Sequence, residues 1–319
     1  MILEKQIVNM YKGMMHKRCD DTETVFYFSP EDFPGLNSER FTFKSSRGDT
    51  LVGYIYSYEN PIPNKLVIFD HGFGGGHRAY MKEIEKLCSH GYTVFSYDHT
   101  GCMESEGESP RGLVQSLVDL NDCIFAIKGE ERFSDFDISV MGHSWGAFST
   151  MNIAPLHPDI SHVVAMCGFV SPKDMIKTTF RGILSLWQNA IYELEANTNP
   201  EFVTCDAIES LRAVDVKALL IYSKDDPICP RVHYDRLRRA LDTKNGISFL
   251  FVDKKGHNPN YTEEAVKILT DFSKKRAKLA RKKNVTKKEK EAFVSSFDWD
   301  KMTEQDERVW DVIFAHLDN

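Results

Sequence analysis

Short apolar runs alternate with longer stretches of helical spacing along most of the chain. The first two runs flank the turn Arg47-Gly48-Asp49 and predict a β-hairpin. The later runs are continuously apolar, as in strands covered on both faces, and helical patterns at 81–91 and 114–129 separate them. The predicted strands are 39–46, 51–58, 65–70, 92–98, 138–142, 162–169, 218–223 and 248–253. This alternation predicts an α/β protein with a mostly parallel sheet and helices on both faces.

Two segments break this alternation. Residues of about 171–213 form a mostly helical insertion between two predicted strands, and we expect a cap over a site. After about residue 275, Thr303 and Asp306 suit a helix start, and apolar residues then recur at helical spacing: Val309, Val312, Ile313 and Leu317. We expect this tail to pack on the body or on a second subunit, and to have no role in a catalytic triad.

The expected organisation is therefore an N-terminal segment (1–38), an α/β domain (39–273) and a basic helical extension (274–319). A length of 319 residues, with 42% hydrophobic and 27% charged residues, fits one large globular domain. No apolar run reaches the length of a membrane span, and the start shows no secretory signal pattern. We expect neither.

Cysteine usage and charge narrow the classes of function. The seven cysteines are widely spaced without a C-x-x-C pair, which indicates reduced thiols in a cytoplasmic protein and no structural zinc site. We expect no metal and no cofactor. The net charge is −7, but residues 274–290 hold ten Lys and Arg against one Glu. That run lacks interleaved aromatic residues, so a solvated helix is favoured over an arm that binds nucleic acid or an anionic membrane.

The strongest chemical motif is Gly142-His143-Ser144-Trp145-Gly146, between a predicted strand and a predicted helix. A G-x-S-x-G sequence in that context forms a strained turn, which exposes the serine oxygen at a helix N-terminus. We therefore predict Ser144 as a nucleophile. His143 beside it is expected to point away and to be structural.

A second motif, Asp70-His71-Gly72-Phe73-Gly74-Gly75-Gly76, follows the strand 65–70. Acyl transfer needs backbone N–H groups aimed at an oxygen that becomes negative. We assign these oxyanion-hole donors to the backbone amides of Phe73 and Trp145. His71 is expected to be a structural hydrogen-bonding residue rather than a catalyst.

These motifs, the segment YDHTGCMES (97–105) and a late Asp and His resemble the α/β-hydrolase superfamily. Over roughly 39–273 the chain looks most like the branch of serine aminopeptidases, monoglyceride lipases and cinnamoyl esterases. That branch carries a D-x-R-G-x-G-x-S pattern. Asp98, Gly101 and Ser105 match this pattern, whereas Thr100 and Met103 replace its arginine and second glycine. The resemblance implies an α/β-hydrolase fold and ester or peptide hydrolysis.

The resemblance also implies the acid of a catalytic triad. The family's acid follows a strand in a turn that ends in proline, and Asp226 falls on it, with Asp225 as the rival. The base should follow after one more strand, and His257 has that place. Cys102 and Cys229 lie on loops near this site and are expected to be bystanders.

We expect a serine hydrolase that cleaves short-to-medium acyl or aromatic esters through an acyl-enzyme. The expected partner is a small-molecule ester, and a homo-oligomer could form through the extension. An apolar wall of the substrate site is assigned to the cap residues Phe180, Leu184 and Trp187. The main alternative is an aminopeptidase, in which Glu193 or Glu195 would hold the free amine.

Two further alternatives stay open. A dinucleotide-binding domain would use Gly72-Phe73-Gly74 and Asp98, but His77 stands where its third glycine belongs. A non-catalytic binding protein with the same fold would have no reason to keep Ser144, Asp226 and His257 together.

Overall fold

A computed structural model of the chain describes residues 2–20 and 23–319. Within them, one eight-stranded sheet has the order β1-β2-β4-β3-β5-β6-β7-β8. The pairs β1–β2 and β2–β4 are antiparallel, and all other neighbours are parallel. The strands are β1 Asn37–Lys44, β2 Thr50–Ser57, β3 Lys65–Asp70, β4 Thr93–Tyr97, β5 Asp137–His143, β6 His162–Met166, β7 Lys217–Ser223 and β8 Ile247–Val252. The predicted parallel sheet, entered through a hairpin, is confirmed.

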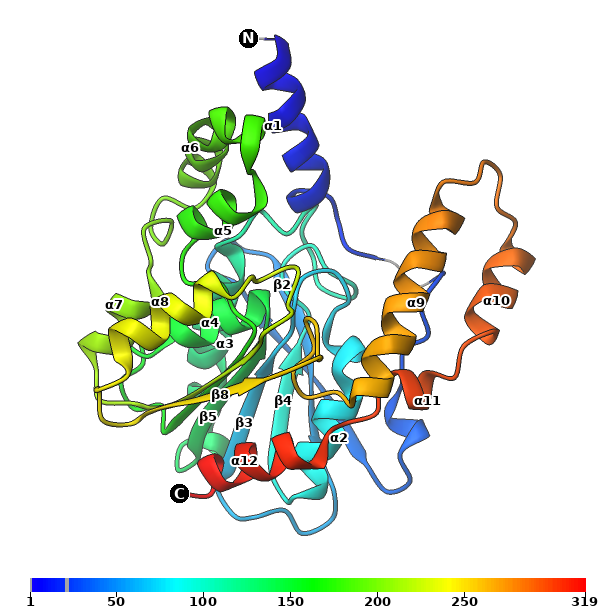
Figure 1. Cartoon of the computed structure of the whole chain (residues 1–319). Coiled ribbons are helices and arrows are strands. Elements are labelled where there is room, and N and C mark those ends of the chain that lie inside the picture. Colours follow the sequence, from blue (N-terminus) through cyan, green and yellow to red (C-terminus); the bar gives the residue numbers. More distant parts are fainter. Residues whose placement is uncertain (1, 21–22) are drawn as a thin grey trace.

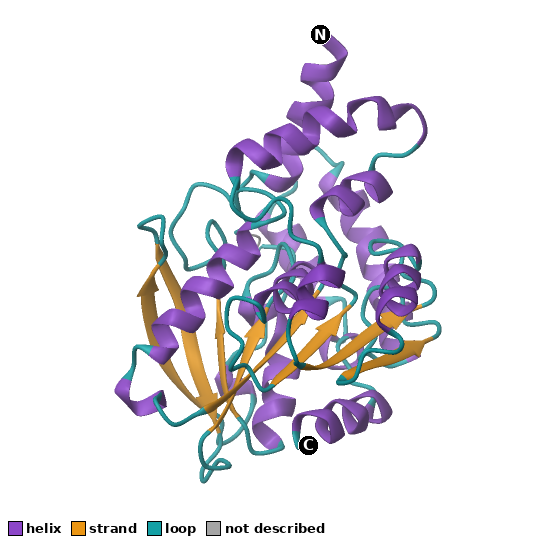
Figure 2. Cartoon of the chain, turned by 90° about the vertical axis from the view of Figure 1, so that its left-hand side faces the viewer, coloured by secondary structure: helices purple, strands orange, loops and turns teal. Residues whose placement is uncertain are grey.

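Helices cover both faces of this sheet (Figures 1 and 2). Successive side chains of a strand point to opposite faces, so Ile68 of β3 joins one apolar cluster and Val67 joins the other. On the first face lie α3 (Gln115–Lys128), α4 (Trp145–Ile153), α7 (Ala207–Ala213) and α8 (Val232–Leu241). On the second lie α2 (Met81–Ser89) and α12 (Glu307–Leu317). The inner strands β3 to β7 are therefore buried on both sides, as their apolar runs predict, whereas the edge strands β1 and β8 are partly exposed.

The cap and an N-terminal helix lie together at one end of the molecule (Figure 1). The helix α1 (Ile2–Met15), which the sequence analysis did not predict, packs on α6 (Gln188–Thr198) of the cap. The cap also contains α5 (Pro172–Thr179), whereas α7, inside the expected insertion, packs on α4. Short 3-10 helices are η1 Pro30–Asp32, η2 His77–Tyr80, η3 Glu131–Phe133 and η4 Gly182–Trp187.

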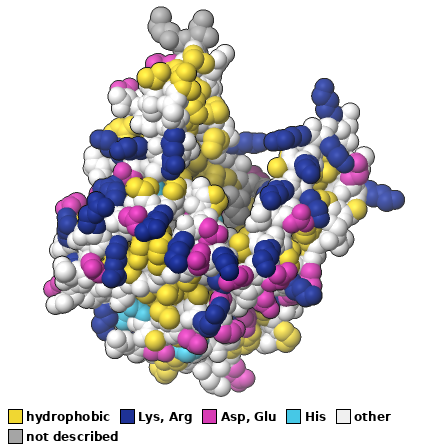
Figure 3. Space-filling view, in the orientation of Figure 1, with side chains coloured by type: hydrophobic (Ala, Val, Ile, Leu, Met, Phe, Trp, Pro, Cys, Tyr) yellow, Lys and Arg dark blue, Asp and Glu magenta, His cyan; other side chains and the backbone are white. Residues whose placement is uncertain are grey.

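The C-terminal segment contains α9 (Glu263–Ala280), α10 (Lys287–Ser295), α11 (Trp299–Met302) and α12. The helix α9 crosses the boundary expected between residues 273 and 274. With α10 it forms an arm whose surface carries many Lys and Arg side chains (Figures 1 and 3). No helix in the described part of the chain is long and apolar enough to span a membrane.

The last helix, α12, returns to the sheet. Val309, Ile313 and Leu317 are buried in the second apolar cluster, as their spacing predicts, and so is Trp310. Val312, which belongs to the same predicted stripe, is 38% exposed. Most of the apolar stripe of α12 is thus buried against the sheet of the same chain. Assembly of two copies through this extension stays a prediction.

Candidate active site

The turn between β5 and α4 carries Ser144. This residue has a left-handed φ of 56° with ψ −110°, a conformation that costs energy for any side chain. A Cβ on Gly142 would lie 2.5 Å from the carbonyl oxygen of Gly146, and one on Gly146 would lie 2.0 Å from that of Asp70. Only glycine fits at both positions. The G-x-S-x-G pattern therefore exists because the backbone must pack this closely around Ser144.

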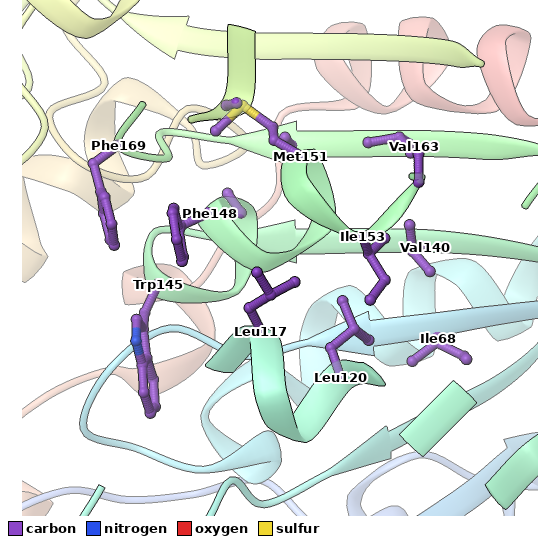
Figure 4. Close-up of a cluster of buried hydrophobic side chains, with 14 of the residues drawn as sticks. Ile68, Leu117, Leu120, Val140, Trp145, Phe148, Met151, Ile153, Val163 and Phe169 are labelled. Carbon is purple, nitrogen blue, oxygen red and sulfur yellow. The ribbon is translucent and has the colours of Figure 1, made fainter. Parts of the chain in front are cut away.

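The helix α4 is anchored in the core behind this turn (Figure 4). Its first residue, Trp145, is 2% exposed, and the indole Nε1–H donates to the carbonyl of Leu113 at 2.7 Å. The Phe148 ring stacks on Phe169 with 4.5 Å between ring centroids. Ser144 thus precedes the N-terminus of a helix that is tightly packed in the core. The N-terminal end of a helix stabilises negative charge.

Asp226 and His257 meet across two loops that follow β7 and β8. His257 Nδ1 donates to Asp226 Oδ2 at 2.7 Å, and Asp226 Oδ1 accepts from the amides of Ile228 (2.8 Å) and Cys229 (3.0 Å). Burial alone would raise the pKa of Asp226, but the bonds from His257 and the two amides lower it below its ordinary value. The carboxylate therefore stays charged and fixes the imidazole tautomer.

Asp225, the rival acid, has a different set of partners. Its Oδ1 accepts from Ser223 Oγ (2.6 Å) and from the amides of Lys255 (3.1 Å) and Gly256 (3.2 Å). It ties down the loop that precedes His257 and does not bond to the imidazole. Of the two neighbouring carboxylates, Asp226 is the one that is hydrogen-bonded to His257.

His143 links the elbow to the loop of His257. Its Nε2–H donates to the carbonyl oxygen of His257 at 2.6 Å, and its Nδ1 accepts from Tyr80 Oη at 2.8 Å. Burial lowers the pKa of His143 to about 3, so the ring is neutral. The expected structural role agrees with these bonds. The ring does not face away from the site, however, because it lines the same cavity as Ser144.

The glycine-rich loop after β3 brings Phe73 beside Trp145, with 5.3 Å between their ring centroids. The amide of Trp145 is in the first turn of α4, where N–H groups have no intrahelical acceptor. His71 donates from Nδ1 to the carbonyl of Gly72 (2.7 Å) and accepts at Nε2 from the amide of His99 (3.0 Å). Burial lowers its pKa to about 3, as suits a neutral structural residue.

A charged network lies beneath the loop and the elbow. His99 is fully buried, with Nε2 3.0 Å from Asp70 Oδ1 and Nδ1 3.2 Å from Asp119 Oδ2. Burial alone would lower the pKa of His99, but the two carboxylates raise it to about 10. Thr100, which replaces the family's arginine, donates its amide and hydroxyl to Asp119, each at 2.8 Å. The two carboxylates therefore favour the charged form of this buried histidine.

Asp98, the acid of the dinucleotide-binding alternative, is committed to other partners. It is 1% exposed, and its Oδ1 accepts from both the amide and Nδ1 of His77 at 2.8 Å. Its Oδ2 accepts from the amide of Glu104 at 3.1 Å. This carboxylate fixes the two loops around it and is not presented to a ribose.

Ser144 and His257 open on a cavity of about 280 Å³, called the Ser144 cavity below. Its lining residues are Met15, Gly72, Phe73, Tyr80, Leu113, His143, Ser144, Trp145, Phe169, Met175, Ile228 and His257. Most are apolar, and none is acidic. Met15 comes from α1 and Met175 from the cap, and neither was expected, because nothing local in the sequence marks them.

The cap residues expected to form the apolar wall lie elsewhere. Among the described residues, Phe180, Leu184 and Trp187 are not part of the lining of the Ser144 cavity. Phe180 is 2% exposed and packs edge-on against Tyr11 of α1, with 6.0 Å between centroids. The cap presents Met175 at this point, because Phe180 is used to join the cap to α1.

Neither glutamate of the aminopeptidase alternative reaches the cavity. Glu195 is fully buried, where it accepts from Tyr11 Oη and, at 2.8 Å, from the amide of Leu113. Glu193 is exposed on α6 and is not in the cavity lining. Within the described residues, no carboxylate lies where it would hold the free amine of a peptide in the Ser144 cavity.

The C-terminal extension holds the loop that carries His257. Lys255 Nζ lies 2.6 Å from Asp306 Oδ2, and both side chains are buried. The amide of Asp306 donates to the carbonyl of Asn260 (2.7 Å), and the amide of Thr262 donates to that of Glu304 (2.9 Å). The tail, expected to have no role in a catalytic triad, thus contacts the loop that carries the candidate base. Its polar residues reach back across more than forty positions, a pairing that no local pattern reveals.

One group of potential metal ligands occurs among the described residues: Cys167, Asp226 and His257 lie with their ligand atoms within 4.8 Å of one another. Burial, with the nearby Asp226, raises the pKa of the Cys167 thiol well above its ordinary value. A protonated thiol is a poor metal ligand, and both oxygens of Asp226 already accept hydrogen bonds. The donors fit a hydrogen-bonded acid–base pair better than a metal site.

Comparisons with known proteins bear on the family and the fold of the chain. Residues 61–209 match the family model described as serine aminopeptidase, S33, a range that contains Ser144 but ends before Asp226. A monoglyceride lipase homolog of monkeypox virus is 30% identical over 119 residues, which cover 34% of this chain and 40% of that protein.

Solved structures give the fold. An esterase of Pyrococcus furiosus superposes with a TM-score of 0.59 at 17% identity, over 81% of this chain and 97% of the esterase. An alpha/beta hydrolase of a Penicillium species has a TM-score of 0.52 at 15% identity, over 76% of this chain and 97% of that one. The chain therefore has the α/β-hydrolase fold, and it is similar to the serine aminopeptidase and monoglyceride lipase branch of that superfamily.

Proposed function

We propose that the protein is a serine hydrolase that cleaves carboxylic esters through an acyl-enzyme. Ser144 is the nucleophile, His257 the general base and Asp226 the acid that orients it. One observation carries this proposal. The buried carboxylate of Asp226 is hydrogen-bonded to an imidazole that opens on the same cavity as a serine in a strained turn.

In the proposed reaction, the Ser144 hydroxyl attacks the ester carbonyl while His257 Nε2 takes its proton. The amides of Phe73 and Trp145 stabilise the oxyanion of the tetrahedral intermediate. Its collapse breaks the bond to the alcohol, and His257 gives the proton to the leaving oxygen. A water that His257 then deprotonates releases the carboxylic acid and restores Ser144. The charged Asp226 stabilises the imidazolium at each of these steps.

The lining of the Ser144 cavity supports an ester over a peptide. Its volume of about 280 Å³ fits a short-to-medium or aromatic acyl group, and Met15, Met175, Phe169 and Ile228 offer it an apolar surface. An aminopeptidase would need a carboxylate there, and the burial of Glu195 against Tyr11 and Leu113 leaves it unavailable. The names of two similar proteins, the monoglyceride lipase homolog and the Pyrococcus esterase, also refer to ester hydrolysis.

A substrate panel tests this function. We expect p-nitrophenyl esters of two to eight carbons to be hydrolysed and aminoacyl nitroanilides to be left intact. Ser144→Ala should lower kcat on the best ester by roughly 10³-fold or more. Turnover of the nitroanilides alone would reverse the assignment to esters. Undiminished ester turnover by Ser144→Ala would remove the proposed nucleophile.

We also propose a cytoplasmic location. All seven cysteines are free thiols, five of them buried, which suits a reducing compartment. No cofactor enters the proposed reaction, since its groups are supplied by the side chains and amides named above.

A further inference from the structure

A second cavity lies on the other side of Phe73. Its volume is about 390 Å³, and it shares Phe73 and Tyr80 with the Ser144 cavity. It lies between the segment that follows α1, the glycine-rich loop, α9 and α11. Figure 1 shows α11 beside one end of α9. We call it the Arg78 cavity. The C-terminal extension therefore forms part of a hollow that adjoins the candidate nucleophile.

Aromatic rings make most of its far wall. Phe26 packs edge-on against Phe28, with 5.1 Å between ring centroids, and lies 6.0 Å from Trp299 of α11. Phe272 of α9 approaches Trp299 at 5.2 Å. Phe26 is 39% exposed, although its ring belongs to this cluster. Such a wall favours a flat, apolar group.

The charged side chains in the described lining of the cavity are cationic. Arg78 and Arg276 line it, and no aspartate or glutamate does so among the described residues. Arg276 is held by Thr24 Oγ1 at 3.0 Å, whereas the Nε–H of Arg78 has only a long bond of 3.4 Å to the carbonyl of Phe28. Arg78 also borders a cleft lined by Arg18 and by three acidic residues, Asp20, Asp98 and Glu104. In residues 2–20 and 23–319, no carboxylate forms an ion pair with the Arg78 guanidinium. A half-buried guanidinium in such a place suits an anionic ligand.

The oxyanion geometry relates the two cavities to the two halves of an ester. If the carbonyl oxygen lies at the amides of Phe73 and Trp145, the acyl and alcohol parts must leave the carbonyl carbon in different directions. The leaving oxygen must face His257, which gives it a proton. His257 lines the Ser144 cavity and the next residue, Asn258, lines the Arg78 cavity, so the loop of His257 borders both cavities.

We propose that the Arg78 cavity is the alcohol subsite, and that it takes an aromatic alcohol that bears a carboxylate. The aromatic wall holds the ring and Arg78 binds the carboxylate, while the acyl chain lies in the Ser144 cavity. This inference rests on the proposed ester hydrolysis and names its substrate class. It also gives the C-terminal extension a part in substrate selection.

Two matched esters test the subsite: 4-carboxyphenyl butyrate and its neutral isostere 4-carbamoylphenyl butyrate. We expect kcat/KM to favour the carboxylate ester by about tenfold, which corresponds to one charge-assisted pair of about 1.4 kcal/mol. Arg78→Met should lower that ratio by about tenfold. The control Arg212→Met, which removes an exposed arginine of α7 that pairs with Glu209, should leave the ratio unchanged.

A second measurement does not depend on the folding of the variant. In the wild-type protein, 4-hydroxybenzoate should inhibit ester hydrolysis about tenfold more strongly than 4-hydroxybenzamide. Equal inhibition, or an unchanged substrate ratio in Arg78→Met, would overturn the subsite. An effect of Arg78→Met on esters with the carboxylate on the acyl chain, but not on the alcohol, would overturn its assignment to the alcohol. If the subsite is overturned while the protein still hydrolyses p-nitrophenyl butyrate, the proposed ester hydrolysis is unaffected.

Discussion

The candidate nucleophile and the candidate base are held in different ways. Ser144 is fixed by its immediate neighbours, because Gly142 and Gly146 let the backbone close tightly around one strained turn. His257 lies on a loop after β8, an edge strand that is only partly buried. Contacts from three distant regions hold that loop: Asp225 after β7, His143 at the elbow and Asp306 in the tail.

This difference indicates which substitutions should disturb the elbow of Ser144 and which should disturb the loop of His257. The elbow is specified mainly by five consecutive residues, so we expect its geometry to tolerate more changes elsewhere in the chain than the loop of His257 does. The loop of His257 depends on buried polar pairs between segments far apart in sequence, so substitutions remote from the cavity should act on the base. The following predictions, from the largest expected effect to the smallest, test that comparison.

The two adjacent aspartates should differ sharply. Asp226→Asn removes the charge that stabilises the imidazolium and disturbs its tautomer, so we expect kcat on the best ester to fall by about 10³ to 10⁴-fold. Asp225→Asn keeps an oxygen that can accept from the amides of the loop, and its loss should be at most about tenfold. Steady-state measurement of kcat for both variants tests this difference. Equal losses would mean that the loop geometry, not the charge at Asp226, limits the reaction.

The buried pair of Lys255 and Asp306 should be the main tie between the tail and the loop. The Arg308 guanidinium and the Lys255 ammonium hold the pKa of Asp306 well below its usual range. Asp306→Asn leaves the Lys255 charge buried without its counter-ion, so we expect the free energy of unfolding to fall by roughly 3–5 kcal/mol.

Chemical denaturation measures this loss, and Glu307→Gln is the matched control. Glu307 is the next residue, but it is exposed and pairs with Lys86 at the surface, so its loss should cost less than about 1 kcal/mol. Activity per folded molecule should also fall in Asp306→Asn and not in Glu307→Gln. Equal stability of the two variants would show that the tail does not brace the loop.

A pH-dependent stability should report on the same region. Glu83 of α2 is buried behind the loop and accepts from Asn260 Nδ2 at 2.9 Å, and burial raises its pKa to about 7. The folded protein therefore keeps a proton that the unfolded chain releases near pH 4.5. The contribution of Glu83 is full below pH 4.5 and is lost as the pH rises through 7.

Glu83→Gln removes this titration. Relative to the wild type, the variant should gain about 3 kcal/mol in free energy of unfolding between pH 4.5 and pH 8, given 1.36 kcal/mol per pKa unit. Urea unfolding at a series of pH values measures the gain. Glu85→Gln, on the same helix but partly exposed, should follow the wild-type profile. Parallel profiles for Glu83→Gln and the wild type would rule out a buried carboxyl that holds its proton.

Local patterns predicted the parts of the molecule that are themselves local. The strands, the hairpin and the elbow follow from apolar runs and from G-x-S-x-G, because burial on two faces and close backbone packing each demand particular residues at short spacing. The helix α1 was missed, since its apolar residues only become informative once Tyr11 and Met15 are placed against the cap and the cavity.

The cap also shows that local patterns do not reveal long-range contacts. Its apolar residues were recognised, but their partners could not be read from the sequence. Phe180 packs on Tyr11, so Met175 faces Ser144 in its place. Likewise, the polar residues of the tail gave no sign that they bond to the loop of His257, because such pairs leave no periodic pattern.

The central claim is that Ser144 is an activated nucleophile. Mass spectrometry of the protein after treatment with a fluorophosphonate probe tests it most directly. The account predicts a single adduct on the peptide that contains Ser144, absent in Ser144→Ala and formed far more slowly in His257→Ala. Folded wild-type protein that carries no adduct at Ser144, or Ser144→Ala protein that still reacts at another serine while it hydrolyses esters, would contradict it.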